Sequence, residues 1–106
     1  MNATFTTPTS RVLVEIAAER SRQDVKWGEQ SHPDGTGNDG DAATAERQRN
    51  RCAIAFADGV GTWRHIIREE IAEAFAESDP ARLRAELIQV AAVAVAWVEA
   101  IDRRKA

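Results

Sequence analysis

The most constraining feature of this 106-residue sequence is an apolar stretch of nine residues, VAAVAVAWV, from Val90 to Val98. Nine residues are too few to cross a bilayer, which takes about 20 residues as a helix. The stretch lies inside a longer segment of helical character, and it is apolar on every face of that helix. Because a helix without a polar face has to be covered on all sides, the stretch belongs in the interior of a helical protein.

Helical patterns also account for most of the remaining chain, and no long run alternates as a strand does. Apolar residues at helical spacing, bounded by capping residues, glycine or proline, predict four helices. The predicted helices span about residues 9–27, 41–58, 63–77 and 80–103. A loose tail is expected over residues 1–8, and a glycine-rich loop over residues 28–40. The sequence therefore predicts one all-α domain, a four-helix bundle spanning residues 1–106.

The apolar fourth helix also bears on the oligomeric state. Three partner helices in one small protomer can hardly cover a segment that is apolar all round. We therefore expect a homodimer or homotetramer in which this helix meets its symmetry mate. The alternative is a monomer in which it is the central helix of the bundle.

Charge and cysteine content restrict the class of binding partner and the cellular compartment that we expect for this chain. The net charge of −3 and the pI of about 5.4 argue against a nucleic-acid polymer as the main partner. Cys52 is the one cysteine, so no disulfide can form within the chain, which fits a reducing compartment. The N-terminus lacks the pattern of a signal peptide, and no membrane-spanning segment is expected. We expect a cytoplasmic protein.

Acidic residues on the third and fourth predicted helices face the same interior. On the third helix, Glu70 and Glu73 fall at the edge of the apolar arc, whereas Glu69 faces away. On the fourth helix, Glu86 and Gln89 lie at the edge of the corresponding arc. No lysine or arginine occupies a matching position on these two faces.

Crowded carboxylates without a counter-charge repel one another, and burial makes their charged forms costlier. A hard divalent cation would resolve the conflict, because Mg²⁺ prefers oxygen ligands. The i, i+3 spacing of Glu70 and Glu73 puts both on one side of a helix, and Glu86 can close the site from the next helix. The pattern predicts a Mg²⁺ site, with Mn²⁺ as a substitute. The alternative is a set of solvated surface acids on a helical hairpin.

The same residues carry a resemblance to a known superfamily. Glu69-Glu70-Ile71-Ala72-Glu73 is followed, after twelve residues, by Glu86-Leu87-Ile88-Gln89. This resembles the E-E-x-x-E and E-x-x-D motifs of the MazG-like and phosphoribosyl-ATP pyrophosphohydrolase superfamily. The segment QVAAVAVAW resembles the apolar helix that follows the motif, and RQDVKWGEQSHPDGTG resembles a branch found in actinobacteria and their phages. The resemblance covers about residues 15–103.

The resemblance implies a MazG-like bundle and a Mg²⁺-dependent nucleoside triphosphate pyrophosphohydrolase, which yields the nucleoside monophosphate and pyrophosphate. It implies that Glu70, Glu73 and Glu86 are catalytic and that they bind the metal together with Gln89. However, Gln89 stands where the superfamily has Asp, and an amide oxygen brings no charge to the metal. The alternative is a degenerate MazG-like module that binds a nucleotide or a protein partner without turnover.

Residues outside the acidic motif suggest where a nucleotide would bind. Lys26 is a candidate contact for a phosphate, and Trp27, which opens the glycine-rich loop, is a candidate for stacking on a base. Alternatively, the lysine is an ordinary exposed residue and the tryptophan plugs one end of the bundle. The arginines of the second predicted helix point in different directions, which favours a solvated helix over a phosphate clamp. They are Arg47, Arg49 and Arg51.

Overall fold

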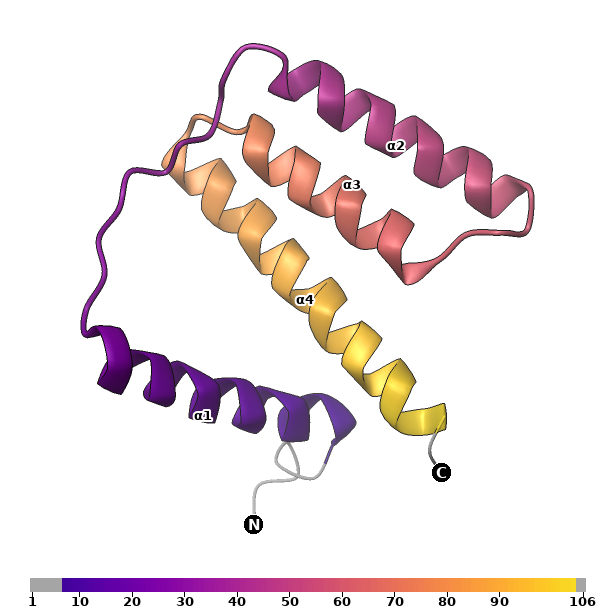
Figure 1. Cartoon of the computed structure of the whole chain (residues 1–106). Coiled ribbons are helices and arrows are strands. Elements are labelled where there is room, and N and C mark those ends of the chain that lie inside the picture. The colour runs from indigo at the N-terminus through magenta and orange to yellow at the C-terminus, as the bar shows by residue number, and fades with distance from the viewer. Residues whose placement is uncertain (1–6, 105–106) are drawn as a thin grey trace. The chain divides into compact units, whose positions relative to one another are not determined.

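The computed structural model describes residues 7–104, and this part of the chain contains four α-helices and no strand. The helices are α1 (Pro8–Trp27), α2 (Asp41–Ala57), α3 (Trp63–Ala76) and α4 (Pro80–Arg104) (Figure 1). The predicted all-α class is confirmed, and every helix end lies within one residue of its predicted position. A loose tail was predicted over residues 1–8. Residues 1–6 lie outside the described residues, and Pro8 belongs to α1.

Side-chain caps fix the starts of α3 and α4. The Thr62 hydroxyl accepts a hydrogen bond from the His65 backbone N–H at 3.3 Å, and His65 Nδ1 accepts one from the Thr62 N–H at 3.1 Å. This reciprocal pair is a capping box, and it gives the histidine a structural role. At the start of α4, Asp79 accepts from the Arg82 N–H at 3.0 Å, and Pro80 occupies the first helical position.

The chain divides into two compact units. Among the described residues, the first comprises 7–33 and 95–104, and the second comprises 34–94, so α4 contributes to both. Within the first unit, the Thr9 hydroxyl donates a hydrogen bond to the Glu99 carboxylate at 2.9 Å. The buried apolar side chains of this unit include Val12 and Val95.

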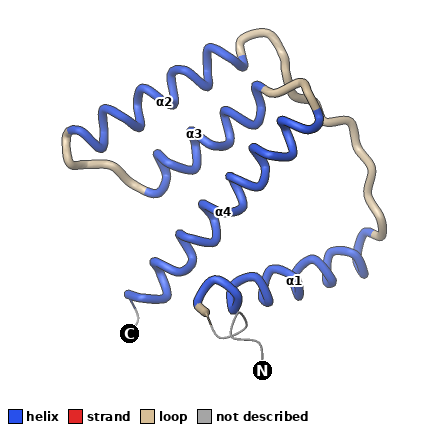
Figure 2. Tube along the Cα trace, turned by 180° about the vertical axis from the view of Figure 1, so that it is seen from behind, coloured by secondary structure: helices blue, strands red, loops and turns tan. Residues whose placement is uncertain are grey.

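The second unit consists of α2, α3 and the first part of α4. Helices α2 and α3 pack against each other and lie side by side in both views of the fold (Figures 1 and 2). The buried residues on these two helices are small, which allows a close approach of the helix axes. They are Ala45, Cys52, Ala55, Ala72 and Ala74.

The glycine-rich segment 28–40 is a loop, and its second half covers the end of α3. The Gly37 N–H donates to the Phe75 carbonyl at 2.8 Å, and the Thr36 hydroxyl donates to the Glu77 carbonyl at 2.6 Å. Gly37 has a φ of +74°, and a Cβ added there would lie 2.7 Å from the Ser78 Cβ. A larger residue at this position would therefore disturb the contact between the loop and α3.

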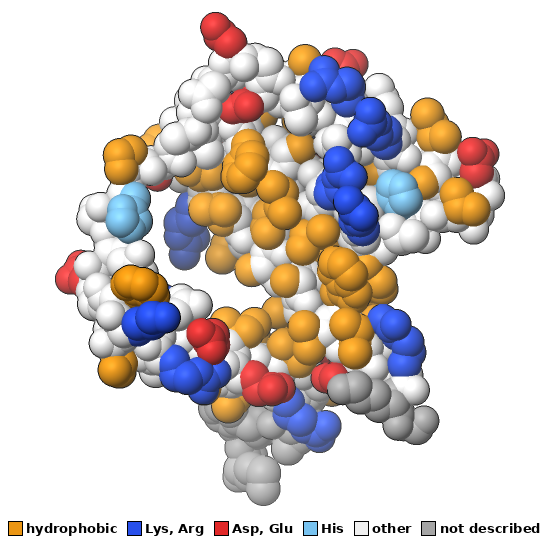
Figure 3. All heavy atoms as spheres, in the orientation of Figure 1, with side chains coloured by type: hydrophobic (Ala, Val, Ile, Leu, Met, Phe, Trp, Pro, Cys, Tyr) orange, Lys and Arg blue, Asp and Glu red, His pale blue; other side chains and the backbone are white. Residues whose placement is uncertain are grey.

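Several apolar side chains are exposed on the single chain. Phe75, Leu87 and Ile88 are 55%, 50% and 58% exposed, and hydrophobic side chains gather over α3 and α4 in Figure 3. The all-apolar stretch is only partly covered, since Val95 is buried whereas Val98 is 39% exposed. Between residues 7 and 104, no helix combines the length and the apolar character needed to cross a membrane.

Candidate metal site

Three glutamates of the second unit converge between α3 and α4. Glu70 and Glu73 are one turn apart on α3, and Glu86 comes from α4. Each offers a carboxylate oxygen, and the three oxygens lie within 4.8 Å of one another. The structure therefore brings together the three acids that the sequence singled out.

The environment of these acids differs from that of ordinary surface carboxylates. All three residues are half-buried, and the Glu73 side chain is 23% exposed. Glu86 Oε2 is buried and has no hydrogen-bond partner within the described chain. A buried carboxylate oxygen without a donor is costly, so this atom calls for a cation, a proton or a bound ligand.

Burial and mutual repulsion both act on the charges of the cluster. Burial raises the pKa of the Glu70 carboxyl above its usual value, and the neighbouring carboxylates, first Glu73 and then Glu86, add to the rise. Burial is also the main reason why the pKa of Glu73 is raised. Glu69 and Glu86 add to that rise, whereas the Arg49 guanidinium opposes it. The cluster is therefore short of positive charge.

The positive charge that does reach the cluster comes from α2, where the sequence suggested only solvated arginines. Arg49 Nε lies 3.4 Å from Glu73 Oε1, with the arginine side chain 53% exposed. Arg49 follows Ala45 by four residues and precedes Cys52 by three, so it lies on the side of α2 that packs on α3. The spacing to these two apolar residues was the signal that could have revealed it.

The prediction that Glu69 faces away from the interior is wrong. Glu69 is half-buried, and it accepts a hydrogen bond from the buried thiol of Cys52 on α2. Burial raises the pKa of the Cys52 thiol, and the hydrogen bond to Glu69 adds to the rise, so the thiol stays protonated as a donor. Glu69 is half-buried because α3 lies between α2 and α4 (Figures 1 and 2), so the side of α3 that faces away from α4 is also covered by a helix.

The other predicted site residues are Gln89, Lys26 and Trp27. Gln89 is one turn after Glu86 on α4, and its side chain is exposed. Lys26 and Trp27 belong to the first unit. Trp27 is 62% exposed, and Lys26 Nζ lies 4.9 Å from the centroid of its ring, a cation–π arrangement.

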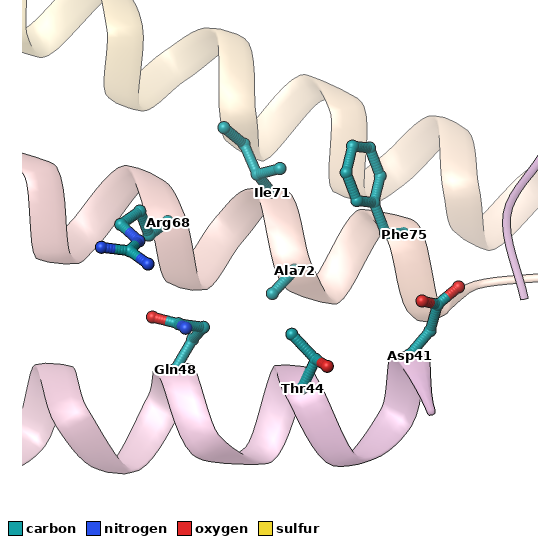
Figure 4. Close-up of a pocket in the computed structure, with 7 residues that line it drawn as sticks. All are labelled: Asp41, Thr44, Gln48, Arg68, Ile71, Ala72 and Phe75. Atoms are coloured by element: carbon teal, nitrogen blue, oxygen red, sulfur yellow. The ribbon is translucent and has the colours of Figure 1, made fainter. Parts of the chain in front are cut away.

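Two grooves flank the line of contact between α2 and α3. One, of about 330 Å³, is lined by residues that include Arg49, Glu73, Glu77 and Glu86. The other, of about 230 Å³, lies on the opposite face of α3 and is mainly apolar on that helix. Figure 4 shows polar side chains rising from α2 toward α3 across this second groove; they are Asp41, Thr44 and Gln48. The acidic groove is therefore the one suited to a cation.

The acidic cluster fits a single Mg²⁺ ion. Opposite ligands of an octahedral Mg²⁺ are about 4.2 Å apart, given bonds of about 2.1 Å. Because the three glutamate oxygens already lie within 4.8 Å of one another, small side-chain rotations would let them share one ion. The ion would also place positive charge beside the Glu86 carboxylate, whose Oε2 is buried without a hydrogen-bond partner.

The raised pKa of Glu70 predicts how the metal-free protein responds to pH. Because folding raises this pKa above 4.5, the charged carboxylate lowers stability at neutral pH, and that cost fades as the pH falls toward 4.5. We expect Glu70→Gln to stabilise the metal-free protein near pH 7 by about 0.5–1 kcal/mol, a small value because partial exposure screens the charges. Chemical denaturation in chelator, near pH 7 and near pH 5, measures the gain. A gain that is equal at both pH values contradicts the prediction.

Comparison with known proteins finds no match for this chain among family descriptions, curated proteins or solved structures.

Proposed function

We propose that this chain is a MazG-like nucleoside triphosphate pyrophosphohydrolase that works with Mg²⁺, or with Mn²⁺ in its place. The observation that carries the proposal is the convergence of Glu70, Glu73 and Glu86, of which Glu86 has a buried Oε2 without a hydrogen-bond partner. The resemblance of the same residues to the superfamily motif supplies the reaction. In that reaction, water adds to the triphosphate, the bond between the α- and β-phosphates breaks, and the monophosphate and pyrophosphate leave.

The proposal gives each glutamate a separate task. Glu70 and Glu73, one turn apart on α3, would hold the metal from one side, and Glu86 would hold it from α4. The bound ion would neutralise and orient the phosphates. A carboxylate oxygen that is not taken by the metal accepts the proton of the attacking water, and a pKa raised by burial brings Glu70 and Glu73 closer to the range in which a general base works. The assignment of Lys26 and Trp27 to substrate binding stays a prediction.

Release of pyrophosphate tests the proposal directly. Purified protein is incubated with Mg²⁺ or Mn²⁺ and each common ribo- and deoxyribonucleoside triphosphate, with a chelator control. We expect metal-dependent release of pyrophosphate together with the monophosphate from at least one of them. Protein that binds the metal but releases no pyrophosphate above the chelator control would overturn the proposal in favour of a non-catalytic module.

The exposed, uncharged Gln89 favours that second candidate, a degenerate relative that binds a nucleotide or a protein partner. Gln89→Asp separates the two. Because the substitution adds a negative charge beside the proposed metal, we expect about tenfold tighter divalent binding in either case. For a working enzyme, turnover should hold or increase, whereas a degenerate module stays at background. Calorimetric titration with Mn²⁺ and a pyrophosphate assay on the same variant measure both. Unchanged metal affinity would remove Gln89 from the site.

We also propose that the protein is a homodimer or homotetramer, joined through α4. The support is the exposed apolar surface of the single chain, which includes Leu87 and Ile88 on α4. Light scattering at micromolar concentration should give at least twice the 11.6 kDa of one chain, and Ile88→Asp should shift the protein toward smaller species. A wild-type mass of one chain would contradict this prediction.

A further inference from the structure

A basic side chain of α2 lines the acidic groove, and its contact there is looser than that of a salt bridge that only stabilises the fold. Among the described residues that line this groove, Arg49 is the single basic side chain. Its contact with Glu73 is long, at 3.4 Å, and the arginine side chain is 53% exposed. A pair this loose and this open to solvent contributes little to stability.

The guanidinium has binding capacity beyond this contact. An arginine carries five N–H donors in a planar fork that matches the oxygens of a carboxylate or a phosphate. Within the described chain, Glu73 is the one residue that pairs with Arg49. Donors therefore remain free in a groove that also contains Glu77 and Glu86.

Arg49 and a divalent ion would compete for the same carboxylate. Glu73 is both the partner of Arg49 and one of the three acids whose oxygens converge. A cation bound by the three glutamates would neutralise Glu73 and so weaken its attraction to Arg49. The guanidinium would then lie beside the metal without a full counter-ion. Under the proposed function, the anion that would enter this groove together with the metal is a phosphate group of the substrate.

We propose that Arg49 is an exchange counter-ion: it pairs with Glu73 before the metal binds and with a phosphate oxygen of the substrate afterwards. This role rests on the proposed function, since it takes the substrate to be a phosphate ester or anhydride bound through the metal. In it, Arg49 restrains the acidic cluster while the groove is empty, and it becomes a binding residue once the metal–phosphate complex arrives. The exchange makes metal binding and phosphate binding depend on Arg49 in opposite directions.

The test is a pair of titrations on the full chain. Mn²⁺ alone is titrated into the wild type, Arg49→Gln and Arg49→Lys, and inorganic pyrophosphate is then titrated into the Mn²⁺-loaded proteins. We expect Arg49→Gln to bind Mn²⁺ about fivefold more tightly, because a competing charge is gone. The same variant should bind pyrophosphate about tenfold more weakly, because a forked donor is lost. Arg49→Lys, which keeps the charge but not the fork, should match the wild type for Mn²⁺ and lose part of the pyrophosphate affinity.

Arg51→Gln serves as the matched control, since Arg51 is an exposed arginine on the same helix that does not line the groove. It should leave both affinities unchanged. Two affinities that fall together in Arg49→Gln, or that both stay at wild-type values, would overturn the exchange, and a melting curve without metal verifies that the variant is folded. A wild type that shows the exchange but hydrolyses no nucleotide would leave Arg49's role intact and remove the proposed function.

Discussion

Glu86→Gln is expected to reduce metal-dependent pyrophosphate release by about 100-fold or more. The substitution preserves the size of the side chain but removes its charge, and it puts an amide where Oε2 is buried without a donor. The metal would lose its charged ligand from α4, so the cluster whose three carboxylate oxygens lie within 4.8 Å of one another would hold it more weakly. Steady-state rates measured at saturating Mg²⁺ and nucleotide give the effect on kcat.

Glu46→Gln is the matched control for this loss, because Glu46 is an exposed glutamate on α2 that does not line the acidic groove. Its rate should match that of the wild type. If Glu86→Gln retains more than about a tenth of the wild-type rate, the α4 carboxylate is not part of the catalytic site.

Saturating Mn²⁺ is expected to raise the free energy of unfolding by about 2.7 kcal/mol at a concentration of about 100 Kd. For a chain of this length, that corresponds to a rise in Tm of about 10 °C or more. The physical reason is that the ion binds only the folded state, in which Glu70, Glu73 and Glu86 converge. Thermal melts with Mn²⁺ and with chelator measure the shift.

Glu73→Gln should abolish most of this shift, since it removes the carboxylate shared by the metal and Arg49. Glu46→Gln should keep the full shift. A wild type whose Tm does not respond to millimolar Mn²⁺ or Mg²⁺ would rule out the metal site and leave the acids as a structural cluster.

The sequence predicted the helices well because their ends are set locally. Thr62, with His65 three residues on, starts α3, and Asp79 followed by Pro80 starts α4, so capping residues and breaks are readable without tertiary contacts. The approach of Glu86 to Glu70 and Glu73 was also readable, since it needs only helical spacing on two successive helices. These features depend on residues that are close together in the sequence.

Contacts of α2 with α3 could not be read in the same way. Whether Arg49 meets Glu73, and whether Glu69 meets Cys52, depends on how α2 is rotated about its axis against α3. The apolar side of α2 consists of small residues, Ala45, Cys52 and Ala55, which mark that rotation only weakly. The sequence therefore did not distinguish Arg49 from the other arginines of α2 as the partner of Glu73.

The crowding of Glu70, Glu73 and Glu86 also has a consequence for laboratory evolution of this protein. Each charge removed from the cluster relieves repulsion in the metal-free fold, so variants that survive heating in chelator would be enriched in glutamine at these positions. Heating in the presence of Mn²⁺ would reverse the preference, because the ion stabilises the variants that keep all three carboxylates. Parallel selections from one library, differing only in divalent ion, would thus diverge first at α3 and α4, and their divergence would map the cluster without any assay of catalysis.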